Sequence, residues 1–593
     1  MKKMILLLIL IIACKNPSIP DDKNITADDI YTHISFLASD QMEGRKAGSK
    51  SDHQTAAYVA KCFDAYGLIP VGNSFFQEFE FAAGMALGKK NFISSEERIS
   101  DSDFTTLSFS SSGQIMDQIV FAGYGISTPD LNYDDYEGLD VKGKMVIVMR
   151  YSPDGEIQDG EFAQFSPLRY KAMAARERGA SGIIFVTGPL EDHDNDKLKT
   201  GGSLGGKQSV GIPAVHVKRS VIDDWLSFSG HPSVEELQDK INKNGSPNPS
   251  SFEIGKTITV STDIDPELLT SRNVIGSIPG SGALKDEWLI LGGHMDHLGW
   301  GGEGSNSMAP DLHEIHNGAD DNASGIAALL ELAAYFSQDT SPTSPRRSLL
   351  FIAFGAEEVG LLGSAYFVEH PSIPLDSAVA MFNMDMVGRL QENSLVIGGT
   401  GTSLSWESLL TDINTDSLDF TFDEEGFGSS DHQSFYLKSI PVLFFFTGAH
   451  EDYHRPSDDV ELLNFPGTVK VTDLIARLTQ RVLTASEKPE YVKVESQKHS
   501  GRKGYSVTFG VIPDFVYSGD GFKISGVREM APAGRAGMQA GDIIISINNI
   551  TTMNIYDYMF ALQSCTAGVE VPVVIQRDGE EIILNIAPQG KED

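Results

Sequence analysis

Apolar runs alternate with a helical pattern over the second half of the chain. Residues 323–338, ASGIAALLELAAYFSQ, place Ile326, Leu329, Leu330 and Ala333 on one helical face. Four strand-like runs with few polar positions precede and follow this helix: 287–294 (EWLILGGH), 348–354 (SLLFIAF), 376–388 (DSAVAMFNMDMVG) and 440–448 (IPVLFFFTG). Strands of this kind are buried on both faces. The pattern therefore predicts an α/β domain whose central sheet is covered by helices on both faces.

The first half of the chain has a different pattern. Residues 26–40 begin with a Thr cap and acids in the first turn, which is typical of a helix. A Gly-rich loop and a second helical pattern follow at 41–68. From Gln114 onward, short β-like runs surround one helical pattern at 169–180. A compact β-rich insert is therefore expected between the first helices and the α/β segment.

The N-terminus has the pattern of a secretion signal. Lys2 and Lys3 precede the apolar run MILLLILIIA, which ends at Cys14 and is too short to span a bilayer. The residues IIAC resemble a bacterial lipobox, in which the signal is cleaved before the cysteine and the cysteine carries lipid. We expect a protein anchored by lipid in the bacterial cell envelope, on the periplasmic side or at the cell surface. A plain signal peptide with an incidental cysteine is the alternative.

Charge excludes one class of partner. The 593 residues carry a net charge of −36, whereas binding to nucleic acid requires a basic surface.

Two cysteines remain beyond the signal, Cys62 and Cys565, and their distance in sequence places them in different domains. We expect no disulfide between them and no role in metal binding.

Candidate ligands follow the strand-like runs. His294 and Asp296 follow the first run, and Glu357 and Glu358 stand side by side after the second. Two adjacent carboxylates repel each other and are costly to desolvate, so a metal ion is the expected compensation. Asp385 lies inside the third run, and His454 follows the fourth. Because ligands in α/β sheets bind at the carboxyl ends of the strands, these side chains are expected to converge.

The residues between the first two runs allow two interpretations. Asp320, Asp321 and Asn322 stand directly before the helix, where the acids are either metal ligands or simple N-cap residues. His313 and His316 lie in the polar loop before them. We expect both histidines at the surface.

Five motifs in this order resemble the M28 family of zinc aminopeptidases: GGHMDHLG, GADDNASG, GAEEVGLLGS, FNMDMVG and YHRPSDD. The resemblance covers about residues 269–487, and the N-terminal helices with LASDQMEGRKAGS complete the domain. The resemblance implies a mixed central sheet of the zinc-peptidase type and two zinc ions. His294 and Asp385 would bind one ion, Glu358 and His454 the other, and Asp321 would bridge both. The peptide bond between Asp321 and Asn322 would be cis.

The resemblance also implies the catalytic groups. Asp296 would orient His294, and Glu357 would be the general base that takes a proton from the water between the two ions and delivers it to the leaving amine. The expected reaction is hydrolysis of N-terminal residues from peptides with a free N-terminus. Manganese or cobalt would also suit the nitrogen and oxygen ligands. The segment GSSDHQSF, with Asp431 and His432, also resembles a segment of the family, in which His432 would either contact the substrate or make structural hydrogen bonds.

Two further segments resemble accessory domains. FAGYGI, YEGLDVKGKMVIVMR, RERGASGIIFV and IPAVHV resemble a protease-associated (PA) domain, and VTFGVIPDF with GVREMAPAGRAGMQAGDIIISINN resembles a bacterial PDZ domain. PDZ domains bind extended peptides by strand addition, so a peptide or protein partner is expected there. The expected bounds are a signal peptide at 1–13, a lipidated tether at 14–23, peptidase segments at 24–108 and 269–487, the PA insert at 109–268, a linker at 488–499 and the PDZ domain at 500–593.

Three other functions stay open on the sequence. A metallopeptidase of different specificity, such as a carboxypeptidase, would have similar ligands. A glutaminyl cyclase would have a similar scaffold with one zinc, which the complete ligand set disfavours. An inactive protein that binds through its PA and PDZ domains is the third alternative, and the presence of every expected ligand argues against it.

Overall fold

The computed structural model describes residues 24–590 apart from short internal stretches. These stretches are 129–130, 156–159, 192–195, 200–208, 245–250, 303–304, 339–343, 495–506, 515–516, 518 and 529–530. The expected signal peptide and the tether with Cys14 lie outside the described residues. Within the described part of the chain, no helix has the length and hydropathy needed to cross a membrane.

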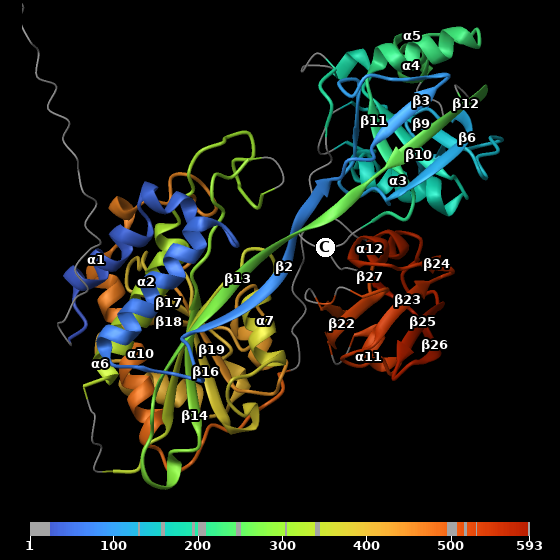
Figure 1. The fold of residues 1–593 in the computed structure, drawn as a ribbon. Helices are drawn as coiled ribbons and strands as arrows, with labels where there is room; N and C mark the ends of the chain where they lie inside the picture. Colours follow the sequence, from blue (N-terminus) through green and yellow to red (C-terminus); the bar gives the residue numbers. More distant parts are fainter. Residues whose placement is uncertain are drawn as a thin grey trace, which may run out of the picture. The chain divides into compact units, whose positions relative to one another are not determined.

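The chain forms two compact units (Figure 1). Among the described residues, one comprises 24–78, 271–302 and 306–494, and the other comprises 79–270, 305 and 507–590. The paired strands β2 (Phe76–Leu87) and β13 (Ile264–Ile278) each have residues in both units.

The first unit contains a nine-stranded sheet in the order β1-β13-β15-β14-β16-β19-β17-β18, with β2 paired to β13. Its centre is parallel, and each strand there corresponds to one of the four apolar runs. These strands are β14 (Trp288–His294), β15 (Ser348–Phe354), β16 (Ala378–Met384) and β19 (Val442–Phe446). The flanking strands β13 and β17 (Ser394–Gly398) run antiparallel to their central neighbours, so the sheet is mixed as predicted.

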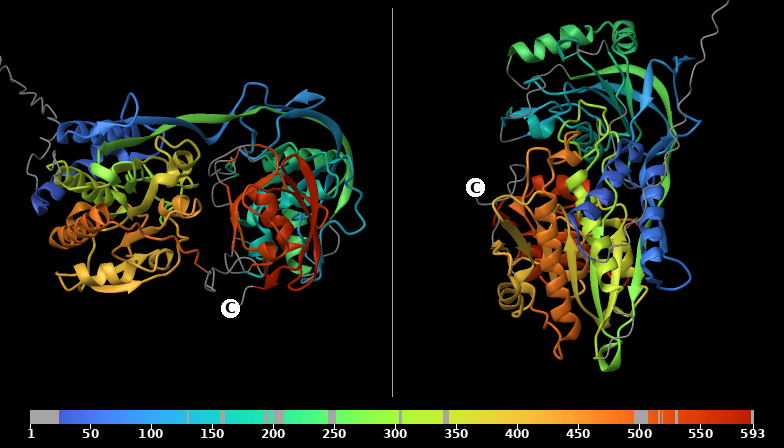
Figure 2. Two further views of the ribbon diagram at one scale, coloured as in Figure 1. Left: turned by 90° about the horizontal axis from the view of Figure 1, so that it is seen from below. Right: turned by 90° about the vertical axis from the view of Figure 1, so that its left-hand side faces the viewer.

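Both faces of this sheet are covered, which confirms the predicted fold class. Leu289 and Leu291 of β14 belong to a core with the large helices, whereas Ile290 belongs to a second core on the other face. The helices of the first core are α1 (Ala27–Leu37), α2 (Lys50–Tyr66), α6 (Gly325–Phe336), α8 (Trp406–Ile413) and α10 (Phe465–Thr484). Those of the second are α7 (Leu362–Glu369) and α9 (His432–Tyr436). In the right-hand view of Figure 2, α1 and α2 in blue and α10 in orange stand in front of the green and yellow strands.

Local sequence signals explain how the first helices begin. Thr26 caps α1 by accepting the backbone N–H of Asp29, as the sequence predicts. Ser49 caps α2 by accepting the backbone N–H of Asp52. Cys62 is buried in α2, whereas Cys565 is buried in the other unit, and both are free thiols.

The second unit contains the PA-like segment and the PDZ-like segment. An eight-stranded sheet has the parallel strands β6 (Gly113–Phe121), β9 (Met145–Met149), β10 (Gly182–Val186) and β11 (Ala214–Val217) at its centre. Helix α3 (Leu168–Glu177) packs on one face, and α4 (Arg219–Phe228) and α5 (Val234–Asn244) pack on the other.

The C-terminal segment forms its own sheet in the order β21-β22-β23-β25-β26. The strands are β21 (Val511–Pro513), β22 (Phe522–Val527), β23 (Ile543–Ile547), β25 (Val571–Arg577) and β26 (Glu580–Ile586). Helix α12 (Ile555–Gln563) covers this sheet and also contacts α3, because Tyr556 and Phe560 pack against the core of the PA-like segment.

Candidate metal centre

The expected ligands sit where the central strands end. His294 is the last residue of β14, Glu357 and Glu358 follow β15, and Asp385 follows β16 directly. His454 lies in the loop after β19. Since β14, β15, β16 and β19 are parallel neighbours, their carboxyl ends share one edge of the sheet.

Asp321 joins this edge from the turn Ala319–Ser324, which leads into α6. The peptide bond between Asp321 and Asn322 is cis, as the family resemblance implies. Asp458 holds the turn from behind, since its Oδ2 accepts the backbone N–H groups of Asp320 at 3.0 Å and Asp321 at 3.1 Å. The other oxygen of Asp458 accepts a hydrogen bond from Arg389 at 3.1 Å.

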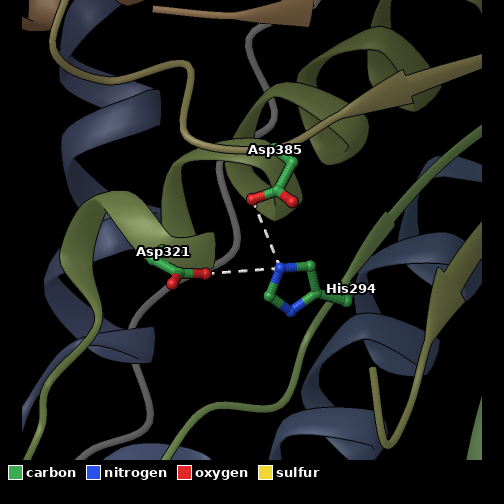
Figure 3. Close-up of side chains that lie close together, drawn as sticks. All are labelled: His294, Asp321 and Asp385. Carbon is green, nitrogen blue, oxygen red and sulfur yellow. Dashed lines mark hydrogen bonds and ion pairs between the residues drawn. The ribbon is translucent and has the colours of Figure 1, made fainter. Parts of the chain in front are cut away.

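A first cluster gathers around His294. Its Nε2 lies 3.3 Å from Oδ1 of Asp321 and 3.3 Å from Oδ1 of Asp385 (Figure 3). Oε2 of Glu357 is 3.9 Å from the same nitrogen. One nitrogen and two carboxylate oxygens therefore face a common point, with Glu357 at its margin.

A second cluster gathers around His454. Its Nε2 lies 3.2 Å from Oδ2 of Asp321 and 3.2 Å from Oε2 of Glu358. Asp321 therefore turns one carboxylate oxygen toward each histidine. This is the arrangement expected of a carboxylate that bridges two ions.

His297 belongs to the second cluster, and the sequence analysis did not select it. Its Nδ1 is 2.7 Å from Oε1 of Glu358 and 3.8 Å from Oδ2 of Asp321. The ring is buried, and its Nε2 has no hydrogen-bond partner among the described residues. The signal was present in the motif HMDH, because His297 follows His294 by three positions in the same loop.

Asp296 makes a different contact from the one that was expected. His294 Nδ1 faces the backbone carbonyl of Asp296 at 3.2 Å rather than its carboxylate. The carboxylate accepts the backbone N–H groups of Glu357 at 2.9 Å and Glu358 at 3.3 Å. Because only one residue separates them, the ring of His294 contacts the main chain of Asp296. The side chain of Asp296 binds the loop after β15 instead.

Burial and close charges shift the pKa values of these side chains in opposite directions. Burial raises the pKa of Glu357 well above its usual range, with the charges of His294 and Glu358 acting in opposite senses. Burial also opposes ionisation of Asp321, but His297, His294 and His454 together hold its pKa well below the usual range. Burial alone would lower the pKa of His454, yet hydrogen bonds with Asp321 and Glu358 raise it to about 11.

These groups fit divalent metal ions. Asp321, Asp385, Glu357 and Glu358 make ion pairs only with histidines within the described part of the chain. Four carboxylates at one buried site need more positive charge than neutral imidazoles provide. Imidazole nitrogens and carboxylate oxygens are suitable ligands for zinc, manganese or cobalt. The two clusters, His294 with Asp321 and Asp385, and His297 with Asp321 and Glu358, have the spacing of metal ligands.

Four other residues were singled out in the sequence analysis. Asp431 is fully buried and His432 is 1% exposed, with its ring stacked on Phe444 at 4.6 Å between ring centroids. His313 is exposed, as predicted. The surface placement of His316 is wrong, because its ring is fully buried and its Nε2 lies 2.8 Å from Oγ of Ser307. The polar composition of the loop suggested exposure and gave no sign of this internal hydrogen bond.

Comparison with protein families assigns each segment. The model of peptidase family M28 matches residues 273–479, the PA domain model matches 115–225, and a PDZ domain model matches 523–577. The matched M28 segment contains every expected metal ligand.

Curated relatives cover the chain in part. Aminopeptidase YwaD of Bacillus subtilis is 34% identical over 191 residues, which make up 30% of this chain and 40% of that protein. The probable lipoprotein aminopeptidase LpqL of Mycobacterium tuberculosis is 27% identical over 356 residues, 56% of this chain and 57% of that protein. The chain thus spans about half the length of these relatives. The solved structure of BSAP, a zinc aminopeptidase from Bacillus subtilis, covers 79% of this chain and 98% of its own, with 22% identity and a TM-score of 0.47.

Proposed function

Because the chain contains a domain of peptidase family M28 together with a PA and a PDZ domain, we propose that it is a metal-dependent aminopeptidase that acts outside the cytoplasm. The observation that carries the proposal is the position of Asp321, whose two carboxylate oxygens face His294 and His454 separately. The names of the relatives YwaD and LpqL, both aminopeptidases, support it. The domain bounds expected from the sequence are part of the same proposal.

Two zinc ions are the proposed cofactors. His294 and Asp385 would hold one ion, Glu358 and His454 the other, and Asp321 both. Bound there, the ions would lower the pKa of a water molecule between them and polarise the scissile carbonyl. His297 is close enough to Glu358 to orient its carboxylate or to join the second ligand set.

Glu357 is the proposed general base. Its carboxylate lies at the margin of the first cluster, and its backbone is fixed by the hydrogen bond to Asp296. In this position Glu357 would accept the proton of the attacking water and then deliver it to the leaving amine. Asp296 is therefore a positioning residue for Glu357 in this proposal.

The proposed substrates are peptides with a free N-terminus. A peptide or protein partner would add to the PDZ domain at β21, which pairs with β22 on one side and forms the edge of its sheet. We also propose that the mature chain begins at Cys14 and is anchored by lipid in the cell envelope. The lipoprotein name of LpqL supports this location.

Hydrolysis of matched peptides tests the proposal. Each peptide is prepared with a free and an acetylated N-terminus and incubated with the metal-loaded chain, with and without a chelator. Release of N-terminal residues from the free peptides alone, abolished by the chelator, is the expected result. Cleavage from the C-terminal end would indicate a carboxypeptidase. Cyclisation of N-terminal glutamine without hydrolysis would indicate a cyclase, and an absence of any reaction would contradict an enzymatic function.

A further inference from the structure

Arg45 is buried beneath the metal centre although it is distant from every ligand in sequence. Its side chain is 1% exposed, and its hydrogen bonds within the described part of the chain all go to backbone carbonyls. Nε donates to Met295 at 3.0 Å, Nη1 donates to Leu37 at 2.6 Å and to Asn317 at 2.7 Å, and Nη2 donates to Gly318 at 2.9 Å. One guanidinium thus joins three separate segments of the chain.

Two of these segments carry metal ligands. Met295 lies between His294 and Asp296 in the loop after β14. Asn317 and Gly318 directly precede the turn that contains Asp321. The planar guanidinium of Arg45 therefore fixes the distance between the loop that begins directly after His294 and the turn that contains Asp321. Several N–H donors in a rigid plane suit this task, whereas a lysine ammonium places all of its donors on one atom.

The backbone around Arg45 is shaped for this contact. Glu43, Gly44 and Arg45 have positive φ angles of 44°, 67° and 48°, a conformation that non-glycine residues seldom adopt. A Cβ atom on Gly44 would lie 2.5 Å from the carbonyl oxygens of Gly299 and His316. The backbone carbonyl of Arg45 accepts the N–H of His297 at 3.2 Å. The segment is thus packed directly against the loop after β14.

The charge of Arg45 also suits the site. Burial lowers its pKa to about 10, so the guanidinium stays cationic at neutral pH, and it lies in the field of Asp321, Asp296, Asp458 and Glu358. A fixed cation near these carboxylates reduces their mutual repulsion before any metal ion arrives. Its hydrogen bonds go to carbonyls, so the carboxylates stay available as ligands.

We propose that Arg45 is a positioning residue of the metal centre, which holds His294 and Asp321 at binding distance by tying their two loops to one buried guanidinium. This inference rests on the proposed function, since it concerns the same metal centre. Arg45 touches neither substrate nor ligand side chains in this role. It acts through the backbone of the residues beside the ligands.

Arg347 offers a matched control. It is also 1% exposed, its Nη1 donates to the carbonyls of Val482 and Ala485, the latter at 2.7 Å, and its Nε makes an ion pair with Glu287 at 2.6 Å. Arg347 directly precedes β15, at the opposite end of that strand from Glu357 and Glu358. A general loss of stability would affect both arginine variants, whereas a loss of metal binding should affect only Arg45→Lys.

The experiment measures metal binding by the full chain, independently of activity. Zinc affinity and stoichiometry are determined by competition with a chelator for wild type, Arg45→Lys and Arg347→Lys. We expect Arg45→Lys to bind zinc about 10- to 100-fold more weakly, the usual effect of losing an outer partner of a metal site. Arg347→Lys should bind as wild type does. Equal affinity of Arg45→Lys and wild type, or an equal loss in both variants, would overturn the inference.

Cobalt gives a second readout if Arg45→Lys is unstable without metal. Saturating Co2+ stabilises the folded state by mass action, and its visible absorption reports the ligand geometry. An altered spectrum in Arg45→Lys with a normal spectrum in Arg347→Lys supports the inference, and two normal spectra contradict it. A wild-type chain that binds no metal would overturn the proposed function as well. Normal metal binding and hydrolysis by Arg45→Lys would overturn only the role of Arg45.

Discussion

The carboxylate of Asp296 accepts the backbone N–H of Glu357 at 2.9 Å. This hydrogen bond joins the loop after β14 to the loop after β15. The second oxygen of Asp296 accepts the next backbone N–H, that of Glu358, at 3.3 Å. One buried side chain thus positions both the proposed base and the adjacent proposed ligand.

Replacing Asp296 with asparagine tests this relationship. Asparagine has only one acceptor oxygen, so its NH2 group would face one of the two backbone N–H donors. We expect kcat to fall about 10- to 100-fold, as is usual when an outer partner of a metal site is lost. Steady-state kinetics with a free peptide measures the effect. Asp286→Asn, at an exposed position, serves as the control. An unchanged kcat in Asp296→Asn would show that this contact has no part in positioning Glu357.

Glu357→Gln separates catalysis from metal binding. Glutamine has nearly the same shape but cannot accept the proton of the attacking water, so we expect kcat to fall by about 10²- to 10⁴-fold. Bound zinc should stay at the wild-type level, because Glu357 is not a proposed ligand. Glu358→Gln is the matched control and should lose zinc together with activity. Full activity in Glu357→Gln would exclude Glu357 as the general base.

Removal of metal should destabilise the peptidase unit. Without an ion, Asp321 makes ion pairs only with histidines among the described residues, and the nearby charge of Arg45 offsets only part of the repulsion between the carboxylates. A ligand at 100 times its Kd stabilises the folded state by about 2.7 kcal/mol, so chelation should lower Tm and added zinc should restore it. Scanning calorimetry of the full chain provides the measurement. A Tm that is identical with zinc and with chelator would contradict a buried metal centre.

The apolar runs were sufficient to predict the central sheet. All four became parallel strands, because a buried parallel strand needs apolar residues on both faces and this requirement is visible in sequence. The convergence of His294, Glu358 and His454 followed from the same rule, since the carboxyl ends of these strands share an edge.

The supporting contacts could not be predicted in this way. Arg45 binds carbonyls more than two hundred residues away in sequence, at Met295 and Gly318, and carbonyls are present at every position. The polar composition of the loop around His316 indicated an exposed side chain. The loop instead folds back, and His316 forms a hydrogen bond with Ser307. Contacts of this kind depend on how loops pack, which neither periodicity nor spacing specifies.

His216 in the PA domain should make the stability of that unit sensitive to acid. The ring is fully buried, its Nδ1 accepts the backbone N–H of Lys199 at 2.9 Å, and its Nε2 lies 3.1 Å from Oγ1 of Thr187. Burial, reinforced by Arg150, lowers the pKa of His216 from 6.5 to about 3. Between these two values the unfolded chain binds a proton at His216 and the folded chain does not, so stability falls as pH falls.

The free energy of unfolding should fall by at most about 1.4 kcal/mol for each pH unit below the pKa of His216 in the unfolded chain. Urea unfolding of wild type and His216→Asn between pH 7 and pH 5 measures it, and the variant should show the shallower dependence. His231→Asn, at a half-buried position in the same unit, should keep the wild-type slope. Parallel pH profiles for His216→Asn and wild type would refute the role of His216.

Arg176 and Asp557 should couple the PA and PDZ domains energetically. Nη1 of Arg176, in α3, lies 3.0 Å from Oδ1 of Asp557, in α12, and the two side chains are 12% and 1% exposed. Because the pair is largely shielded from water, we expect a coupling of about 1–3 kcal/mol in a double-mutant cycle of Arg176→Ala and Asp557→Ala, measured by urea unfolding. The exposed pair Arg98 and Asp101 serves as the control and should couple by less than about 1 kcal/mol. If the effects of Arg176→Ala and Asp557→Ala on the free energy of unfolding are additive, this ion pair does not hold the two domains together.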